Sequence, residues 1–222
     1  MIRQKGFAIS NVPLFSGLNR EEISLIREIA HIREYQSGKI LFIEGDLSDA
    51  FYIVISGEVQ IIKPSVEGKE KLLEIMKAGD FFGEMGIVDG RCRSATARVT
   101  KESSLMVLEK DDFLSLIKTN PEVALRIIVE LSHRLRRANN DIENLAFLDV
   151  KTRLKNLFIR RAEKDGEFEK ELVLIERLTH EQLAKFIGTS RETVTRVMNK
   201  LESEGLIEVD KDKFILKKIE NW

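Results

Sequence analysis

The chain has 222 residues, of which 43% are hydrophobic and 33% charged, and its formal net charge is −1. This composition is typical of a globular protein, and no apolar run reaches the roughly 18 residues that span a bilayer. The basic start of the chain is not followed by the apolar stretch of a signal peptide. A single cysteine, Cys92, excludes an intramolecular disulfide and a cysteine-clustered metal or iron–sulfur site. These features predict a cytoplasmic protein with no membrane segment and no metal.

The first half of the chain combines a short helix with many short strands. Asn19 is the expected N-cap of a helix over Arg20–Ala30, because two glutamates follow it in the first turn. Short apolar or alternating runs separated by glycine turns then follow, as in a sandwich, roll or barrel. The predicted strands are Ile40–Ile43, Phe51–Ile55, Val59–Ile62, Leu72–Met76, Thr96–Val99 and Leu105–Leu108. The predicted turns contain Gly45, Gly57, Gly68, Gly79 and Gly90.

A long helix without glycine is predicted from Pro121 to about Leu148. Apolar residues recur along it in alternating steps of four and three, a row that we call the seam: Ala124, Ile128, Leu131, Leu135, Ala138, Ile142 and Leu145. Two apolar residues per heptad form the narrow stripe of a coiled coil, which favours packing against a second copy of the chain. The alternative is an amphipathic helix that packs only on its own domain.

Residues 151–222 carry a net charge of +2, whereas residues 1–150 carry −3. A nucleic-acid-binding domain needs a local basic face rather than a high overall charge. The expected elements of this part are a helix over Lys151–Glu163, an extended segment over Glu171–Ile175, two short helices, and a hairpin of Leu206–Val209 with Lys213–Leu216. Two short helices around a glycine turn form a helix-turn-helix, and the hairpin makes it winged.

The two short helices have recognisable start and stop signals. Thr179 and Gln182 match a capping box, and the helix that they begin ends before Gly188. Ser190 caps a second helix over Arg191–Ser203. We expect the N-terminal end of this second helix to enter the major groove of DNA. The alternative is a structural helix bundle whose charges lie in solvent.

The side chains of these helices fall into two predicted kinds of DNA contact. Arg191 and Arg196 can each donate two hydrogen bonds to guanine, and Glu192 can accept one from cytosine N4. A carboxylate beside DNA is unfavourable unless it reads a base, so Glu192 supports the assignment. The candidates for phosphate contacts, which position the protein without reading sequence, are Thr179, His180, Ser190 and Thr193.

A second candidate site lies in the strand-rich half. The glycine-rich segment Phe81–Ile87 can offer backbone N–H groups to an anion, Arg93 can bind phosphate oxygens with two donors, and Ser94 adds a hydroxyl. Glu84 can accept a hydrogen bond from a sugar hydroxyl. Together these residue types suit a nucleotide. Glycine-rich turns with an arginine are common, so a tight turn with a surface ion pair is the alternative.

Three motifs in order resemble the Crp–Fnr family of transcription regulators, which includes the cyclic AMP receptors. They are Gly83–Gly86 with Arg93–Ala95, the hinge Asn144–Val150, and Ser190–Val194 at the start of the second short helix. The resemblance covers about residues 45–215. It implies effector contacts at Gly83, Glu84, Met85, Arg93, Ser94, Arg134, Ala138 and Asn139. It also implies that Arg191, Glu192 and Arg196 read the G·C pairs of a half-site like TGTGA.

One place departs from the family pattern. Where members that bind cyclic AMP carry a Thr-Ser pair that contacts the adenine, this chain has Ala138 and Asn139. Ala138 leaves space for a base, and Asn139 still offers a donor and an acceptor to a purine edge. Cyclic AMP is therefore the first expected effector, and another nucleotide is the alternative.

We predict an α+β protein with an effector-sensing β-roll (a jelly roll) over residues 1–120, a dimerisation helix and hinge over 121–148, and a winged helix-turn-helix over 149–222. The predicted function is a homodimeric transcription regulator gated by a cyclic nucleotide as allosteric ligand, without a required cofactor and without enzymatic activity. Its expected partners are a palindromic operator in double-stranded DNA, a second copy of the chain, and RNA polymerase. The alternative is an effector-independent regulator whose β-roll serves dimerisation and polymerase contact.

Overall fold

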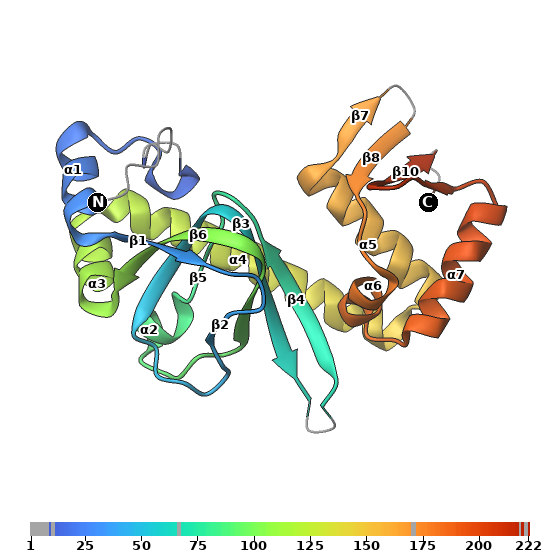
Figure 1. The fold of residues 1–222 in the computed structure, drawn as a ribbon, viewed down its shortest axis with the longest axis horizontal. Helices are drawn as coiled ribbons and strands as arrows, with labels where there is room; N and C mark the ends of the chain where they lie inside the picture. The colour runs from blue at the N-terminus through green and yellow to red at the C-terminus, as the bar shows by residue number, and fades with distance from the viewer. Residues whose placement is uncertain (1–8, 10–11, 66–67, 170–171, 218, 220–221) are drawn as a thin grey trace. The chain divides into compact units, whose positions relative to one another are not determined.

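The computed structural model describes residues 9, 12–65, 68–169, 172–217, 219 and 222. The chain divides into two compact units, Met1–Arg134 and Leu135–Trp222. Helices and strands are both abundant (Figure 1), which confirms the α+β class. The boundary between the units falls inside the long helix α4 (Pro121–Phe147). The three-part division at residues 120 and 148 stays a prediction.

The first unit is built on an antiparallel sheet with the strand order β1-β6-β3-β4, in which β2 also pairs with β6 and β5 with β3. Its strands are β1 (His31–Tyr35), β2 (Ile40–Phe42), β3 (Ala50–Pro64), β4 (Glu70–Met76), β5 (Phe81–Phe82) and β6 (Thr96–Glu109). Its helices are a 3-10 turn (Pro13–Phe15), α1 (Arg20–Ile29), α2 (Met85–Asp89), α3 (Lys110–Thr119) and the first half of α4. The predicted cap of α1 is confirmed, because Asn19 and Glu22 form a capping box.

Alternate side chains of β3 pack into two different apolar cores. Phe51 and Ile53 are fully buried in a cluster that includes residues of α1, α3 and α4. Tyr52 and Val54 point to the other face, into a cluster inside the roll that includes Phe82 and residues of β6. A strand buried on both faces needs this continuous apolar sequence, because side chains alternate with a period of two.

Two pairs of predicted strands are each one continuous strand. β3 contains Phe51–Ile55 and Val59–Ile62, and β6 contains Thr96–Val99 and Leu105–Leu108. The turn predicted at Gly57 is therefore wrong. Pairing of β3 with β6 shifts register around this glycine, whose φ is +90°, and a Cβ there would lie 2.6 Å from Ser103 Cα. Gly57 marks an irregularity of the β-bulge type, which bends a long strand without ending it.

The glycine-rich segment that was predicted as a turn also contains a helix, α2, directly after Glu84. Sequence patterns missed further short elements as well. These are β1, β5, α3 and β7 (Glu167–Glu169). The strands β5 and β7 have only two and three residues, too few for a period to be recognised.

The second unit contains the helix-turn-helix. After α4 come α5 (Val150–Asp165), β7, β8 (Leu172–Glu176), α6 (His180–Ile187), α7 (Arg191–Ser203), β9 (Ile207–Val209) and β10 (Lys213–Lys217). The four strands pair in the order β7-β8-β10-β9. Its core is formed by buried side chains of α5, α6, α7 and the sheet, among them Phe158, Leu183, Val194, Met198 and Phe214. The predicted pair of short helices and the hairpin are confirmed.

Helix α4 has an apolar face that is buried and another that is exposed. Val123 and Ile127 are buried in the core of the first unit, and Leu131 packs against that core. Ile128, Leu135 and Ile142, seven residues apart on the seam, are 58%, 63% and 66% exposed. One face therefore packs on its own unit and includes Leu131 of the predicted seam. A second apolar row is uncovered within the single chain, and its packing against a second copy stays a prediction.

Candidate effector site and nucleic-acid interface

The candidate effector site begins where β5 ends. Gly83, which follows β5, has φ +86°, and a Cβ there would lie 2.7 Å from Arg93 Nη1 and 3.1 Å from the Ala50 carbonyl oxygen. Only glycine permits this backbone conformation together with the close approach of the arginine. Gly83 therefore brings the segment 83–86 and Arg93, ten residues later, to one place.

Arg93 is 4% exposed, and its hydrogen bonds are made inside the protein. Nη1 donates to the Gly83 carbonyl at 2.9 Å, and Nη2 donates to the Ala50 carbonyl at 2.8 Å and to Asp49 Oδ1 at 3.0 Å. The guanidinium carbon lies 4.1 Å from the centre of the Phe42 ring. Nε is buried without a hydrogen-bond partner. The predicted phosphate donor is thus present with one donor unpaired and with the carboxylate of Asp49 as its anionic partner.

Glu84 is a buried carboxylate, 1% exposed, that makes an ion pair with Arg134 of α4. Arg134 Nη1 donates to Glu84 Oε1 at 3.0 Å, and Arg134 also donates to the Phe81 carbonyl and to Glu130. Glu84 Oε2 is buried and has no partner. Burial raises the pKa of Glu84, and the charge of Arg134 opposes this effect. One carboxylate oxygen is therefore left without a hydrogen-bond partner from the protein.

The remaining predicted effector residues differ in placement. Ser94 is exposed, with its Oγ 3.7 Å from Sδ of the half-exposed Met85. The structure thus gathers six of the predicted residues in the first unit: Gly83, Glu84, Met85, Arg93, Ser94 and Arg134. Ala138 and Asn139 are exposed residues of α4 in the second unit, and their role stays a prediction. Sequence analysis missed Asp49, because a carboxylate after a turn shows no local sign of a partner 44 residues away.

The helix-turn-helix is fixed by local caps. Thr179 Oγ1 accepts a hydrogen bond from the backbone N–H of Gln182, and the side-chain oxygen Oε1 of Gln182 accepts one from the backbone N–H of Thr179. These two bonds confirm the capping box. Gly188 ends α6 in the left-handed conformation, and Ser190 Oγ accepts from the Thr193 N–H to begin α7. The oxygens of Thr179 and Ser190 are thus already used as caps, and their predicted phosphate contacts, with that of Thr193, remain untested.

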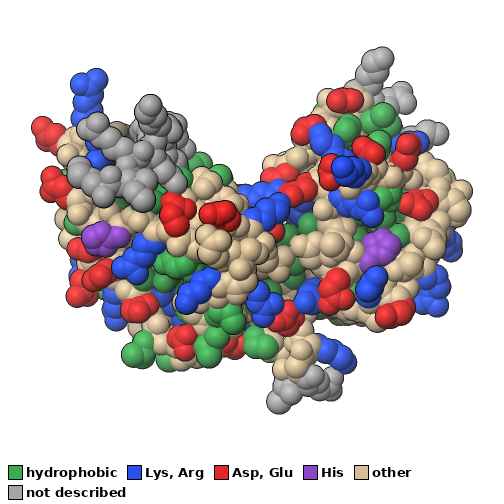
Figure 2. Space-filling view, viewed as in Figure 1, with side chains coloured by type: hydrophobic (Ala, Val, Ile, Leu, Met, Phe, Trp, Pro, Cys, Tyr) green, Lys and Arg blue, Asp and Glu red, His purple; other side chains and the backbone are tan. Residues whose placement is uncertain are grey.

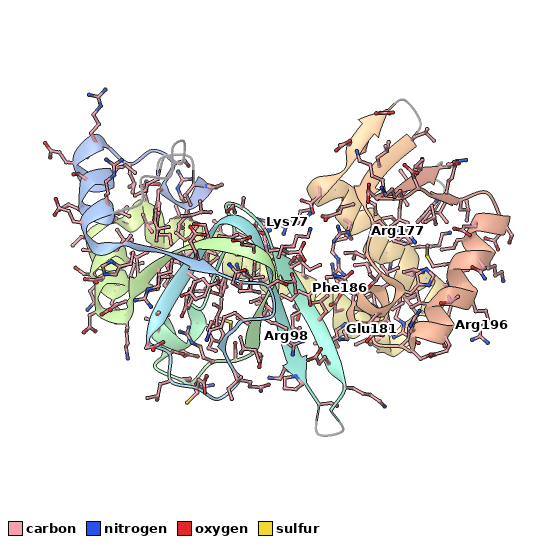
Figure 3. All side chains as sticks on the ribbon, viewed as in Figure 1. Lys77, Arg98, Arg177, Glu181, Phe186 and Arg196 are labelled. Atoms are coloured by element: carbon pink, nitrogen blue, oxygen red, sulfur yellow. The ribbon has the colours of Figure 1, made fainter. Side chains whose placement is uncertain are left out.

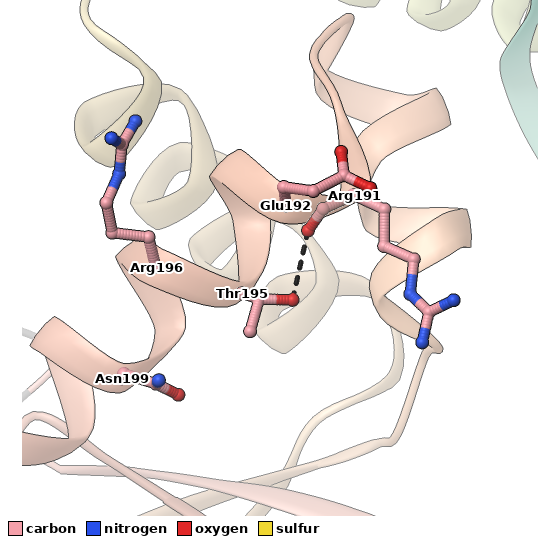
Figure 4. A pocket seen from close by; sticks show the side chains of 5 residues that line it. All are labelled: Arg191, Glu192, Thr195, Arg196 and Asn199. Atoms are coloured by element: carbon pink, nitrogen blue, oxygen red, sulfur yellow. Dashed lines mark hydrogen bonds between the residues drawn. The ribbon is translucent and has the colours of Figure 1, made fainter.

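The outer face of α7 carries the predicted base-reading side chains. Arg191, Glu192, Arg196 and Asn199 are exposed and, with the half-buried Thr195, line a shallow hollow (Figure 4). Arg196 extends away from the helix (Figure 3). None of the four exposed side chains is needed for the core, so all of them are available to a ligand.

A second hollow adjoins the first and shares Arg191 with it. It is lined by Glu176, Arg177, Leu178, Thr179, His180, Glu181, Arg191, Lys211 and Asp212. Arg177 Nη1 donates to the carbonyls of Asp210 and Lys211 in the wing turn, which fixes the wing beside the start of α6. Arg177 and Lys211 are cations that sequence analysis did not assign. On the face that Figure 2 shows, Lys and Arg side chains of this unit lie among acidic ones, so its basic character is local.

Two further observations concern the ranges that the structure describes. No helix in them is long and apolar enough to cross a membrane. No group of three or more His, Cys, Asp or Glu side chains in them could hold a metal ion.

Both units match known protein families. Residues 32–120 match the cyclic nucleotide-binding domain, and residues 152–221 match the Crp-like helix-turn-helix domain. The chain is 35% identical over 195 residues to a cyclic AMP receptor protein of Thermus thermophilus, covering 88% of each. It is 30% identical over 203 residues to a CRP-like cAMP-activated global transcriptional regulator of Mycobacterium tuberculosis, covering 91% of each.

A solved structure gives the same result. The c-di-GMP responsive global regulator CLP of Xanthomonas campestris has a TM-score of 0.75 and 27% identity, and the match covers 90% of this chain and 99% of that one. The two family domains occur in the same order as the candidate effector site and the helix-turn-helix described above. The chain therefore belongs to the Crp–Fnr family of DNA-binding transcription regulators.

Proposed function

We propose that this regulator is a homodimer that binds a palindromic operator when a cyclic nucleotide, cyclic AMP first, occupies the first unit. The observation that carries the proposal is the pair of unpaired, buried polar atoms at the candidate site, Glu84 Oε2 and Arg93 Nε. An unpaired buried polar atom costs about 1–3 kcal/mol, so a ligand that supplies both partners is favoured. The regulator acts on DNA and RNA polymerase in the cytoplasm.

The chemistry of this pair selects a class of ligand. Arg93 Nε can donate to a phosphate oxygen, and Glu84 Oε2 can accept from a hydroxyl. A free inorganic anion would satisfy the arginine alone and would be repelled by the carboxylate. A ribose phosphate presents both groups, which supports a nucleotide.

The ion pair of Glu84 with Arg134 connects the candidate ligand site to α4, because Arg134 belongs to that helix. Arg134 is the last residue of the first unit and holds Glu84, Glu130 and the Phe81 carbonyl. A ligand that shares Glu84 with Arg134 changes the contacts of α4. Such a ligand biases the helix only if it binds one arrangement better than another.

These contacts select the phosphate and the ribose of the ligand, and they do not select its nucleobase. One relative responds to c-di-GMP by its name, while others are named for cyclic AMP. Ala138 and Asn139 stand where the cyclic AMP pattern has Thr and Ser. Cyclic AMP is the first candidate because the relatives of 30–35% identity carry that name, and a second nucleotide is the alternative.

Calorimetry tests the effector. Cyclic AMP, cyclic GMP and c-di-GMP are titrated into the full chain, alone and with a duplex that carries inverted TGTGA half-sites. We expect one nucleotide to bind, and the duplex to tighten its binding about 5- to 150-fold, because coupling between two ligands is reciprocal. The absence of binding by all three, or equal affinity with and without DNA, contradicts cyclic-nucleotide gating and favours the effector-independent alternative.

Sedimentation tests the homodimer. The exposed row Ile128, Leu135 and Ile142 matches the a positions of the seam, and we propose that a second copy covers it. Leu135→Lys places two like charges in that apolar interface, so the variant is expected to sediment as a monomer. Asn140→Lys adds the same charge at the position farthest from the seam and is expected to remain dimeric. A dimeric Leu135→Lys protein contradicts this interface.

A further inference from the structure

Two side chains from different helices of the DNA-binding unit share a hydrogen bond. Nδ1 of His180, the first residue of α6, lies 2.8 Å from Oγ1 of Thr195 on α7. The same Oγ1 donates to the carbonyl oxygen of Arg191 at 3.0 Å, which Figure 4 shows as a dashed line. A hydroxyl has one hydrogen, and here it is used for the Arg191 carbonyl. In this arrangement Thr195 accepts from His180, and Nδ1 carries the proton.

This bond fixes what the other ring nitrogen can do. A neutral imidazole has one N–H, so with Nδ1 protonated Nε2 is only an acceptor. A DNA phosphate likewise offers only acceptor oxygens at neutral pH. Neutral His180 therefore cannot donate to a phosphate through Nε2, whereas the imidazolium can.

The groups around His180 come from several elements. In the hollow that it lines, the cations are Arg177, Arg191 and Lys211, and the carboxylates are Glu176, Glu181 and Asp212. Glu202 of α7 also acts on the ring electrostatically. Burial lowers the pKa of His180, the charges of Arg177 and Arg191 lower it further, and Glu202 opposes them. This lowered pKa favours the neutral ring in the free protein.

We propose that His180 contacts a DNA phosphate only when its ring is protonated. Thr195 is the positioning residue, because it keeps the proton of the neutral ring on Nδ1. The proposal rests on DNA binding by the second unit and does not depend on which effector the first unit binds. A phosphate placed among Arg177, His180, Arg191 and Lys211 adds negative charge beside the ring and accepts a hydrogen bond from Nε2. Each chain then takes up one proton at His180 on binding DNA.

The direction of the pH dependence follows from this uptake. Phosphate raises the pKa of His180 in the complex above its value in the free protein. Between these two values the complex holds one more proton than the free chain, so affinity rises as pH falls. The effect is at most tenfold per pH unit for each proton. Below the free pKa both states are protonated and the dependence from this group ends.

The experiment measures the dissociation constant of the full chain, with and without saturating cyclic AMP, for two duplexes, one with inverted TGTGA half-sites and one of random sequence, from pH 8.0 to 5.5. Ionic strength is held constant because phosphate contacts depend on salt. A phosphate contact acts on both duplexes, so the wild type should gain about three- to tenfold with each duplex as pH falls. His180→Gln should lose this gain.

Variants of Thr195 separate positioning from a structural role. Thr195→Val removes the acceptor, which frees the ring to carry its proton on Nε2 and to donate while neutral. We expect this variant to show a smaller pH dependence of DNA affinity than the wild type. Thr195→Ser keeps the hydroxyl and should restore the wild-type profile. A residue with only a structural role would instead weaken binding equally at every pH.

Two outcomes overturn the inference. One is a wild-type pH profile equal to that of His180→Gln. The other is a DNA affinity that decreases as pH decreases in the wild type but not in His180→Gln. That result would show that Nε2 accepts a hydrogen bond from DNA. If neither duplex is bound at any pH, with or without the nucleotide, DNA binding by this chain fails instead, and that result is distinct from a flat profile.

Discussion

In the effector site the side chains that carry the chemistry are buried, whereas on the DNA-binding face they lie in solvent. Arg93 and Glu84 are 4% and 1% exposed, and both are bonded to other parts of the first unit. Arg191 and Arg196 are exposed on a helix whose position depends on caps and core residues only. A ligand of the first site meets side chains that are already bonded within the protein, whereas DNA meets side chains that lie in solvent.

This difference predicts that substitutions in the two sites have different effects. In the effector site, binding and stability change together, because each polar side chain also satisfies a buried partner. On the DNA-binding face, binding changes while stability does not. The following variants test this contrast, from the largest expected effect to the smallest.

Arg93→Ala should abolish nucleotide binding, because it removes the main positive charge available to the phosphate. It should also lower the free energy of unfolding, since the carbonyls of Gly83 and Ala50 lose their donor at about 1–3 kcal/mol each. Calorimetry and thermal unfolding of the same samples measure both effects. Arg98→Ala is the control, because Arg98 pairs with Glu70 in the same sheet and should leave nucleotide affinity unchanged. An unchanged free energy of unfolding in Arg93→Ala would contradict the statement that binding and stability change together in the effector site.

Arg191→Ala and Arg196→Ala should each cost about 1–3 kcal/mol of DNA binding and relax the preference at one base position. Thermal unfolding should not change, because neither side chain is buried. Binding to a set of duplexes with single substitutions in TGTGA tests both statements. If affinity falls equally for every duplex, these arginines contact phosphates and the base-reading assignment is wrong.

Asp49→Asn should strengthen nucleotide binding about two- to fivefold. Asp49 is the anionic partner of Arg93 and competes with a ligand phosphate for it. Its side chain is 82% exposed, so the ion pair is weak and the gain is small. Asp89→Asn removes a nearby exposed carboxylate that pairs with Arg91 instead, and should change affinity less. Equal gains in both variants would mean that Asp49 acts only through overall charge.

Patterns in the sequence predicted the helices of the second unit to within one or two residues. The bonds of Thr179 with Gln182 and of Ser190 with Thr193 join residues three apart, so the signal and the structure are equally local. The seam on α4 was readable for the same reason, because a helix repeats its faces every few residues. The family motifs around Gly83, Asn144 and Ser190 then indicated the fold class of the whole chain.

Tertiary structure decided the rest. Whether Gly57 turned the chain or bent a strand depended on Ser103, which lies on another strand. Arg93 is bonded to Asp49, 44 residues earlier, and Nδ1 of His180 is hydrogen-bonded to Thr195 on the next helix. A short polar motif specifies which groups are present. Which of those groups are buried, paired or left open is decided by contacts between distant segments, because burial and pairing are properties of the packed chain.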